Sequence, residues 1–557
     1  MRLIEKISAH LLLFCVFAAA GLNVMLLCKL SVGAWCLPSL FVVYVGGWFG
    51  IQWLQRRALP TRRQISAVIL TPLLFLLVAK GLGFMYDTSW DGQDYQQSGV
   101  IALHAGWNPW YQKDLPITLP QSTNYVVGYP KLTWLLQDSV YTLTGNLQMA
   151  TITNVVAAIA AGGLVYGALR RLKLGNKWAI GITLLAVLQI HFLQQLPTFM
   201  QDGLSYELSL AAIAALLIFM LDNRQWLLLG AFLSAWIWLA GSKFSNLFVC
   251  ALLALACLAY LYKIKAYRRV ELRWLLAVGV LGILSLGVPY STNVIRFGSP
   301  VYPQNQAGAS QKLLDDNLPT NIKHDNRLAL LFYGIFSHIE PSDAGAPSSN
   351  GNVARLKVPF TFAPYEFEQL NNFQGRLGSG GLLFSGIVCL SAIGYGMAAF
   401  TKKNASGRRF FVGVSVLVGL IILAALVIPV ANKLRYSPLV TLIPLLVTVL
   451  CVQVTRGRQH LKISALVIVL LVAANTGIAA TSFAMARNHE AAVINSQLAA
   501  MRSTHQVYQV QASNLYSSYT RLTQARVPFV VAKQLTCPHP STLEYTNWTT
   551  GFCSLHK

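Results

Sequence analysis

The sequence predicts an all-α polytopic membrane protein with about thirteen transmembrane helices and a small C-terminal outer domain. Hydrophobic residues make up 55% of the 557 residues, charged residues make up only 11%, and the mean hydropathy is +0.52. A soluble domain carries about 25% charged residues, so this chain has too little charged surface for a soluble protein. Apolar runs long enough to cross a bilayer, about 17–25 residues, recur along most of the chain.

The expected spans follow one another with short connections, except at three places. We place them at 8–28, 38–55, 65–85, 147–169, 178–196, 204–221, 226–241, 246–262, 274–290, 380–400, 410–430, 437–455 and 463–482. The first run is long and has no clear cleavage site, so we expect an uncleaved anchor rather than a signal peptide. The pair covering 226–262 could also form a hairpin or a re-entrant pair.

The positions of Lys and Arg predict the orientation of these spans. With the N-terminus in the cytoplasm, the short cytoplasmic segments hold more than half of the 43 basic residues and only three acids, Glu5, Asp222 and Glu271. Positive charge collects in cytoplasmic loops, so the C-terminus is expected outside. The net charge of +24 is explained in the same way, and we expect no nucleic-acid partner.

Long polar segments occur only on the expected outer side. They are the loops 86–146 and 291–379 of a transmembrane module spanning 1–482, and the C-terminal domain 483–557. The sequence contains neither GxxxxGK[ST] nor GxGxxG, which argues against an ATP-driven transporter and against a cytoplasmic nucleotide-sugar enzyme. The chemistry is therefore expected on the outer face.

The first outer loop begins with a cluster of acids. Asp87, Asp91 and Asp94 follow the third span, and their spacing places them on one face if the segment is helical. Like charges at that spacing repel unless a cation or hydrogen bond offsets them, which indicates a base, a metal site or a cationic partner. Trp90 and Tyr95 beside them indicate a wall for stacking sugars or an interfacial aromatic belt. Two short helices lying on the membrane are expected at 93–104 and 130–143.

This loop and four later segments resemble the GT-C superfamily of membrane glycosyltransferases, as found in uncharacterised bacterial members. The four segments are PTFMQDGLSYE (197–207), NVIRFGSPVYP (293–303), GRLGSGGLLF (375–384) and NKLRYSPLVTLIPLL (432–446). The resemblance covers roughly 80–500 and implies a polyprenyl-phosphate-linked sugar as the donor substrate. It also implies a catalytic Asp or Glu in the first outer loop.

Asp91 is the expected catalytic base, with Asp87 as the second catalytic candidate. Gly92 leaves room for a substrate to approach closely, and Trp90 is placed to stack on a sugar. Asp87 would then orient the acceptor, and Asp94 would support the site. Asp87 and Asp91 are the pair that would hold a divalent cation if the enzyme uses one. If none of the three acids is catalytic, Asp202 and the acids Glu366 and Glu368 are the next candidates.

A lipid phosphate requires cations at the outer ends of spans, because its headgroup lies at that level. Arg binds phosphate through two parallel hydrogen bonds. The expected donor-binding residues are Lys243, Arg296, Tyr302, Arg376, Lys433, Arg435 and Tyr436. Each cation could instead reach a lipid headgroup, and Arg296 could close a loop.

The C-terminal tail matches no segment of the superfamily. Cys537 and Cys553 lie on the expected outer side with 15 residues between them, which predicts a disulfide. We expect a small outer domain that caps the site or contacts the acceptor.

The sequence thus predicts a glycosyltransferase of the bacterial plasma membrane, acting on the outer face. The acceptor would be a cell-envelope glycan, lipid or protein. A GT-C-like glycan polymerase or ligase is one alternative, and a transporter or flippase of lipid-linked sugars is the other. Few charges fall within the expected spans and no repeated halves are visible, which favours an enzyme over a transporter.

Overall fold

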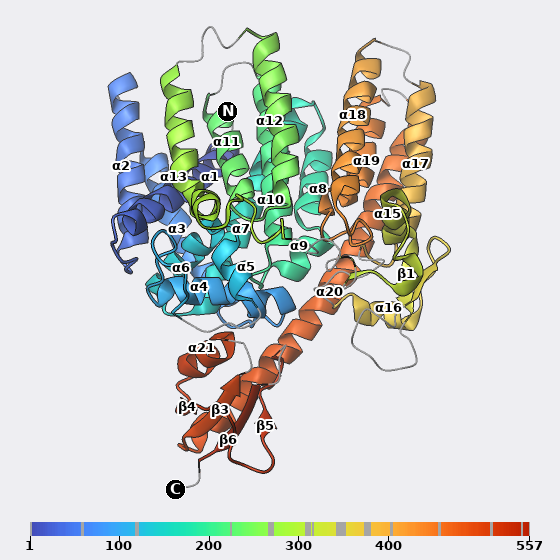
Figure 1. Ribbon diagram of the computed structural model, residues 1–557. Helices are drawn as coiled ribbons and strands as arrows, with labels where there is room; N and C mark the ends of the chain where they lie inside the picture. The colour runs from blue at the N-terminus through green and yellow to red at the C-terminus, as the bar shows by residue number, and fades with distance from the viewer. Residues whose placement is uncertain are drawn as a thin grey trace.

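The computed structural model shows a bundle of long helices with a small α/β domain extending from one end (Figure 1). The structure describes the chain except for residues 1–2, 57–60, 117–121, 223–225, 266–271, 307–313, 315–316, 341–352, 372–379, 402–404, 455–457, 513–515, 547–549 and 556–557.

The bundle helices are apolar along most of their length, as the hydropathy pattern predicts. In chain order they are α1 (Leu3–Leu27), α2 (Cys36–Arg56), α3 (Arg62–Leu82), η2 (Leu147–Thr151) leading into α7 (Ile152–Arg171), α8 (Asn176–Val187), α9 (Ile190–Gln195), α10 (Gln201–Leu221), α11 (Trp226–Ala240), α12 (Asn246–Lys263), α13 (Leu272–Phe297), α17 (Phe384–Thr401), α18 (Ala405–Val427), η6 (Pro438–Leu442) leading into α19 (Ile443–Val454), and α20 (Gln459–Ser503).

Each predicted apolar run falls on one or two of these helices. Within the described residues, 9 helices are long and apolar enough to cross a membrane. The other predicted runs coincide with shorter apolar helices, Val68–Leu82, Asn176–Val187, Trp226–Ala240 and Pro438–Val454. The chain is therefore a multi-pass membrane protein, while the count of thirteen crossings stays a prediction.

Close packing of α1 on α7 depends on small residues along α7. Ala160 is 0% exposed, and Gly163 lies so close to α1 that a Cβ there would meet Ile4 at 3.0 Å. Small side chains allow helix backbones to approach in a membrane. At the expected cytoplasmic end, Arg171 Nη1 lies 2.6 Å from the buried Glu5 Oε1, and Arg171 Nη2 lies 3.0 Å from Asp222 Oδ2. These pairs connect α1, α7 and the end of α10.

Short elements cover the end of the bundle from which α20 emerges (Figure 1). The two helices expected on the membrane are present as α4 and α6. The full set is the π-helical turn η1 (Gly92–Gln96), α4 (Gln97–His104), α5 (Thr123–Gly128), α6 (Leu132–Thr144), η4 (Thr320–Ile322), α15 (Arg327–Phe336), the antiparallel pair β1 (Ser337–Glu340) and β2 (Val353–Leu356), and α16 (Pro364–Gln369).

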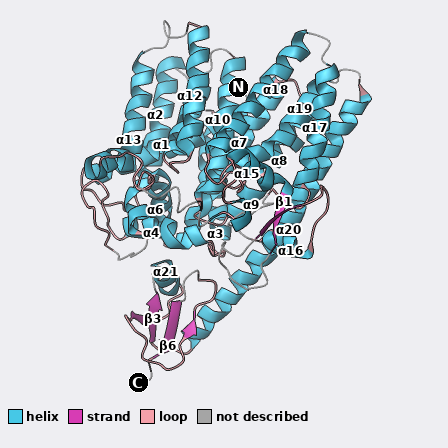
Figure 2. Ribbon diagram, turned by 45° about the vertical axis from the view of Figure 1, so that its right-hand side comes forward, coloured by secondary structure: helices cyan, strands magenta, loops and turns pink. Residues whose placement is uncertain are grey.

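The C-terminal domain is an α/β unit and not purely helical. Its strands are β3 (Tyr508–Ala512), β4 (Phe529–Val531), β5 (Ser541–Thr542) and β6 (Thr550–Ser554), with α21 (Tyr516–Gln524) between β3 and β4. The sheet order is β4-β3-β6-β5, with β3 parallel to β4 and antiparallel to β6. Figure 2 shows this sheet beside the end of α20, and Ile494, Leu498 and Met501 of α20 belong to the domain core. The predicted boundary at 482/483 thus falls inside a continuous helix of 45 residues.

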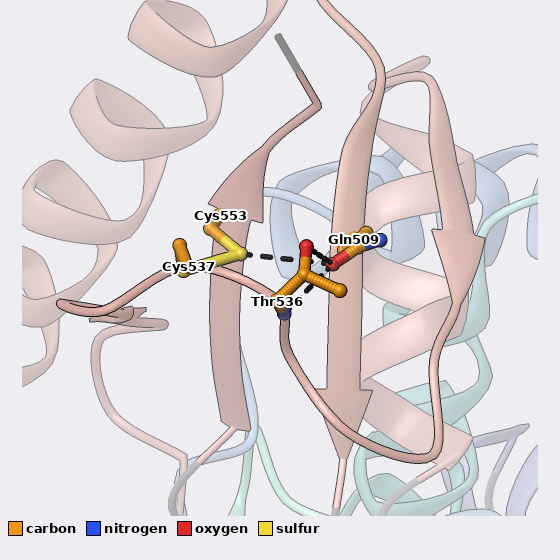
Figure 3. Close-up of a disulfide and its surroundings, with 4 residues drawn as sticks. All are labelled: Gln509, Thr536, Cys537 and Cys553. Atoms are coloured by element: carbon orange, nitrogen blue, oxygen red, sulfur yellow. Dashed lines mark hydrogen bonds between the residues drawn. A yellow bond between two sulfur atoms is a disulfide. The ribbon is translucent and has the colours of Figure 1, made fainter.

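The structure joins Cys537 and Cys553 in a disulfide, with 6.2 Å between their Cα atoms (Figure 3). Cys553 lies on β6 opposite Gln509 of β3. The Gln509 side-chain oxygen accepts hydrogen bonds from Thr536 N at 3.1 Å and Thr536 Oγ1 at 2.8 Å. The disulfide and these hydrogen bonds attach the segment before β5 to the sheet.

Candidate active site

Asp87 organises the turn that precedes η1. Its side chain is 0% exposed. Ser89 donates to Asp87 Oδ1 from its N–H at 2.8 Å and from its hydroxyl at 2.5 Å, and Phe199 N–H donates to Oδ2 at 2.7 Å. A Cβ on Gly92 would collide with the Asp87 carboxylate. The room at Gly92 was expected to admit a substrate, but in the structure the Asp87 side chain occupies it.

The environment of Asp87 is that of a structural carboxylate. Burial raises the pKa of Asp87, and the hydrogen bonds from Phe199 and Ser89 oppose that rise. These donors satisfy both carboxylate oxygens within the protein. The carboxylate therefore joins the turn 87–92 to the chain before α10.

Asp91, four residues further on, has a different environment. Its side chain is 22% exposed, and its Oδ2 lies 3.2 Å from Arg435 Nη2. Arg435 Nε in turn lies 4.0 Å from Asp202 Oδ2, and Lys243 Nζ donates to Asp202 Oδ1. The four side chains form a continuous chain of alternating charge, which we call the ion-pair cluster.

Four separate parts of the fold supply the ion-pair cluster. Asp91 immediately precedes η1, and Asp202 lies in the first turn of α10. Lys243 lies between α11 and α12, while Arg435 lies between α18 and η6. Helix ends meet here at the covered end of the bundle, so residues distant in sequence become neighbours.

Tyr436 completes the cluster on its cationic side. Its hydroxyl accepts a hydrogen bond from Arg435 Nη2. The Tyr436 ring lies 4.6 Å from Lys243 Nζ and 4.5 Å from Arg435 Cζ, measured to the ring centroid. Both cations thus contact one aromatic face, an attractive arrangement in a buried site.

The charges of both cations are stabilised despite burial. Burial alone would lower the pKa of Arg435, but Tyr436, Asp91 and Asp202 hold it above its usual value. Burial would likewise lower the pKa of Lys243, and the carboxylate of Asp202 raises it. Both side chains therefore stay charged at neutral pH.

Tyrosines surround the approach to Asp91. Tyr95 is partly buried, and its ring centroid lies 5.5 Å from that of Tyr125 and 5.4 Å from that of Tyr129. Burial, followed by the negative charge of Asp91, raises the pKa of Tyr95 well above its usual value. Asp94 Oδ1 accepts a hydrogen bond from Ser122 Oγ at 2.6 Å. Tyr95 and Asp94 thus connect the acidic turn to the segment around α5.

A groove adjoins the ion-pair cluster and runs between α10, α12 and α18. One part of its lining is polar and the other part is apolar. The polar part contains Asp202, Ser205, Asn246, Arg435 and Tyr436, and the apolar part contains Val249, Ile421, Ala424, Ala425, Val427, Ile428 and Leu439.

Other expected donor-binding residues lie outside the ion-pair cluster. Lys433 Nζ donates to Asn317 Oδ1 at 2.6 Å. Arg296 closes a loop, as the alternative anticipated, by donating to the carbonyl of Trp110 at 2.9 Å. Tyr302 stacks on Phe297 with 3.8 Å between ring centroids.

Several further candidates can also be placed. Trp90 is 40% exposed, so its ring remains accessible for stacking. Glu366 Oε2 pairs with Lys357 Nζ at 2.6 Å. Arg376 lies outside the described residues, and so does the side chain of Glu368.

The importance of two residues near Asp91 was not recognised from the sequence. Asp202 was kept as a reserve candidate, although the segment PTFMQDGLSYE already placed it at the outer start of a span. Tyr129 was not singled out, and no spacing rule connects it to Tyr95. Both lie close to Asp91 because of tertiary contacts.

The residues present were considered for a metal site. No group of three or more His, Cys, Asp or Glu side chains with suitable placement occurs in the described part of the chain. Asp87 already accepts three hydrogen bonds, so a cation bound to it would have to displace at least one donor. The Asp87–Asp91 pair therefore fits a divalent cation poorly.

Comparison with known proteins gave one structural match. No family model and no curated protein matches this chain. A crystal structure of ArnT from Cupriavidus metallidurans bound to undecaprenyl phosphate matches at a TM-score of 0.33 and 14% identity, covering 83% of this chain and 86% of ArnT. A TM-score of this size carries no weight for function, so the function proposed for this chain rests on its own geometry.

Proposed function

We propose that this protein is a membrane glycosyltransferase. It transfers a sugar from a polyprenyl-phosphate donor to a cell-envelope acceptor on the outer face. The observation that carries this proposal is the ion-pair cluster, in which the partly exposed Asp91 lies beside the buried cation Arg435 at the polar end of a groove.

The groove fits the two parts of such a donor. Arg435 and Lys243 supply positive charge for the phosphate, and the apolar side chains of α18 supply a surface for the first isoprene units. Before the donor binds, Asp91 and Asp202 neutralise these cations. The phosphate takes the place of Asp91 on Arg435 Nη2, which leaves the Asp91 carboxylate without its cation beside the reacting sugar.

The reaction is a displacement at the anomeric carbon. The acceptor hydroxyl oxygen forms a bond to this carbon while the bond from the carbon to the phosphate oxygen breaks. The proton of the acceptor hydroxyl goes to Asp91, because the hydroxyl alone is too weak a nucleophile at neutral pH. The polyprenyl phosphate leaves with its negative charge stabilised by Arg435 and Lys243, so no separate acid is required.

Neighbouring residues position this reaction. Asp87 fixes the turn that carries Asp91, and the Tyr95 and Tyr129 rings form a wall beside it. Lys433, two residues from Arg435, remains a predicted donor contact. Its Nζ now donates to Asn317, so binding the phosphate would require exchanging that partner.

A transporter of lipid-linked sugars is the alternative from a different class. Glu207 favours it, because this acid is buried within α10 and its carboxylate has no hydrogen-bond partner among the described residues. Buried acids within spans are characteristic of ion-coupled transport. A single-sugar transferase moves one sugar from the donor to the acceptor, and a glycan polymerase or ligase moves a whole lipid-linked glycan. A transporter moves the intact donor across the membrane.

The test is to incubate the purified full chain in lipid nanodiscs with a panel of polyprenyl-phosphate sugars and cell-envelope extract. We expect release of polyprenyl phosphate and appearance of the sugar in the acceptor fraction. Arg435→Lys should reduce donor use by about ten- to a hundredfold, since Lys lacks the fork that reaches several partners. Lys113→Gln, which changes an exposed cation of the loop between α4 and α5, is the control for loss of a positive charge outside the ion-pair cluster. If the donor instead moves across the membrane without being cleaved, the protein is a transporter and the proposed enzymatic function is wrong.

A further inference from the structure

A second cavity lies between the bundle and the C-terminal domain. Its volume is about 360 Å³, and it is separate from the groove at Arg435. Small-molecule sites typically measure about 300–1,000 Å³. Its lining comes from the chain following α3, from η2, from α20 and from α21: Gly83, Tyr86, Asn146, Gln148, Asn495, Leu498, Ala499, Arg502, Arg521, Gln524 and Ala525.

The charged side chains that line this cavity are all positive. It offers two guanidinium groups, four carboxamides and a phenol, and no carboxylate occurs among the described lining residues. The formal charge of the described lining is therefore positive, although the carboxylate of Asp87 acts on Arg521 electrostatically. Amides and hydroxyls hydrogen-bond the hydroxyls of sugars, while Arg pairs with carboxylate or phosphate through two parallel bonds.

Arg521 is the buried cation of the cavity. Its side chain is 8% exposed, Nη1 donates to the carbonyl of Glu544 at 3.0 Å, and the guanidinium lies 5.2 Å from the Tyr86 ring. Burial lowers the pKa of Arg521 to about 10. Its contacts in the described structure include no paired carboxylate, so an incoming anion would supply the counter-charge. Arg502, at the end of α20, is exposed on the same cavity.

We propose that this cavity binds the anionic portion of the acceptor, a saccharide that carries a carboxylate or phosphate group. Arg521 and Arg502 bind the anion, and the surrounding amides bind the sugar hydroxyls. The identification of this saccharide as the acceptor rests on the proposed glycosyltransferase function. Binding of an anionic saccharide to the cavity does not depend on that function.

The location of the cavity suits an acceptor. Gln148 lines it and accepts a hydrogen bond from Asp87 N–H at 3.1 Å, and Tyr86 donates to Asn495 at 2.8 Å. Five residues of chain lead from Tyr86 to Asp91, which spans at most about 18 Å when extended. One oligosaccharide can therefore occupy the cavity and present a hydroxyl to Asp91.

The test is direct binding to the full chain in nanodiscs, measured by isothermal titration calorimetry without donor. Three probes are used: a tetrasaccharide of hexuronic acids, the same tetrasaccharide after carboxyl reduction, and a neutral tetrasaccharide bearing one phosphate. We expect at least one anionic probe to bind, and the reduced probe to bind at least about tenfold more weakly. The two anionic probes decide between carboxylate and phosphate.

The variants locate the site. Arg502→Gln changes an exposed side chain, so folding should persist while the anionic probe binds about tenfold more weakly. Lys533→Gln removes an exposed charge of the same domain away from the cavity, and it should bind like the parent chain. Equal binding of charged and reduced probes, no binding of either anion, or equal losses in both variants would overturn the proposal. Because donor cleavage is measured separately, those outcomes leave the proposed function standing.

Discussion

Replacing Asp87 and Asp91 separately by Asn should separate folding from catalysis. The substitution keeps the size of each side chain and removes its negative charge. Asp91 is 22% exposed and makes one ion pair at 3.2 Å, and Arg435 keeps its contact with Asp202 when that pair is lost. The amide oxygen of Asn can still accept a hydrogen bond from Arg435, which also keeps Tyr436, so the loss of stability should stay below the roughly 3–5 kcal/mol of a fully broken buried pair. Loss of a general base reduces turnover by about 10²- to 10⁴-fold. Asp91→Asn should therefore fold and bind donor but turn over slowly.

Asp87→Asn should show the reverse pattern. The Asn oxygen can still accept from Ser89, but its NH₂ group then faces Phe199 N–H, which now donates to Asp87 Oδ2 at 2.7 Å. One charge-assisted hydrogen bond is lost and a buried donor is left unsatisfied, at a combined cost of about 3 kcal/mol. We expect a lower melting temperature and a reduced yield of folded protein.

The assay compares both variants with the parent chain at equal amounts of folded protein. Thermal unfolding in nanodiscs is followed by tryptophan fluorescence, and turnover is followed by release of polyprenyl phosphate. Asp94→Asn, whose amide oxygen can still accept the hydrogen bond from Ser122, serves as a control for removing an acid from this loop. Near-normal turnover of Asp91→Asn would refute the role of Asp91. A thermally normal but inactive Asp87→Asn would make Asp87 the base.

Four further predictions address other parts of the molecule. Lys243→Gln should lower stability by about 3–5 kcal/mol because it leaves Asp202 short of a buried partner, and the double variant with Asp202→Asn should recover part of the loss in thermal unfolding. Non-reducing peptide mapping should find Cys537 linked to Cys553, and Cys537→Ser should destabilise the outer domain by about 3 kcal/mol in limited proteolysis; complete alkylation of both thiols without reductant would contradict the link. An alkaline-phosphatase fusion at the C-terminus should be active, because the C-terminus is expected outside. A fluorescent GFP fusion together with an inactive phosphatase fusion at that position would contradict this topology. Treatment with EDTA should leave turnover unchanged because Arg435 and Lys243 supply the phosphate charge, and a loss restored by Mg²⁺ would place a divalent cation in the reaction.

Hydropathy made the helical bundle predictable, whereas the orientation inferred from charge stays a prediction. An apolar run can satisfy its backbone in lipid only as a helix, so the positions of runs and helices agree closely. The failures occurred where length was ambiguous. The residues after 482 were expected to be helical at first, but the domain boundary was placed at 482/483 because hydropathy falls there, whereas α20 continues to Ser503. The sheet of the C-terminal domain was missed because its strands have 5 residues or fewer.

The acidic loop was predictable as a region, but not in the roles of its members. Sequence spacing treats Asp87 and Asp91 alike, since both follow the third span. Their difference arises from Phe199 on one side and Arg435 on the other, which lie 112 and 344 residues away in the sequence. Pairings at such separations depend on the tertiary fold, so no local pattern reveals them.

The continuous helix α20 limits how this protein can be divided. At ~1.5 Å per residue its 45 residues extend about 68 Å, roughly twice the hydrocarbon thickness. The same helix contains an apolar stretch long enough to cross the membrane, contacts Thr88 through Glu490 at 2.8 Å, and contributes Leu498 to the core of the C-terminal domain. The C-terminal domain is therefore not an interchangeable module that can be cut off at the end of the apolar stretch. Chimeras between related proteins should succeed when the junction lies before Gln459, so that the last span and the outer domain are inherited together.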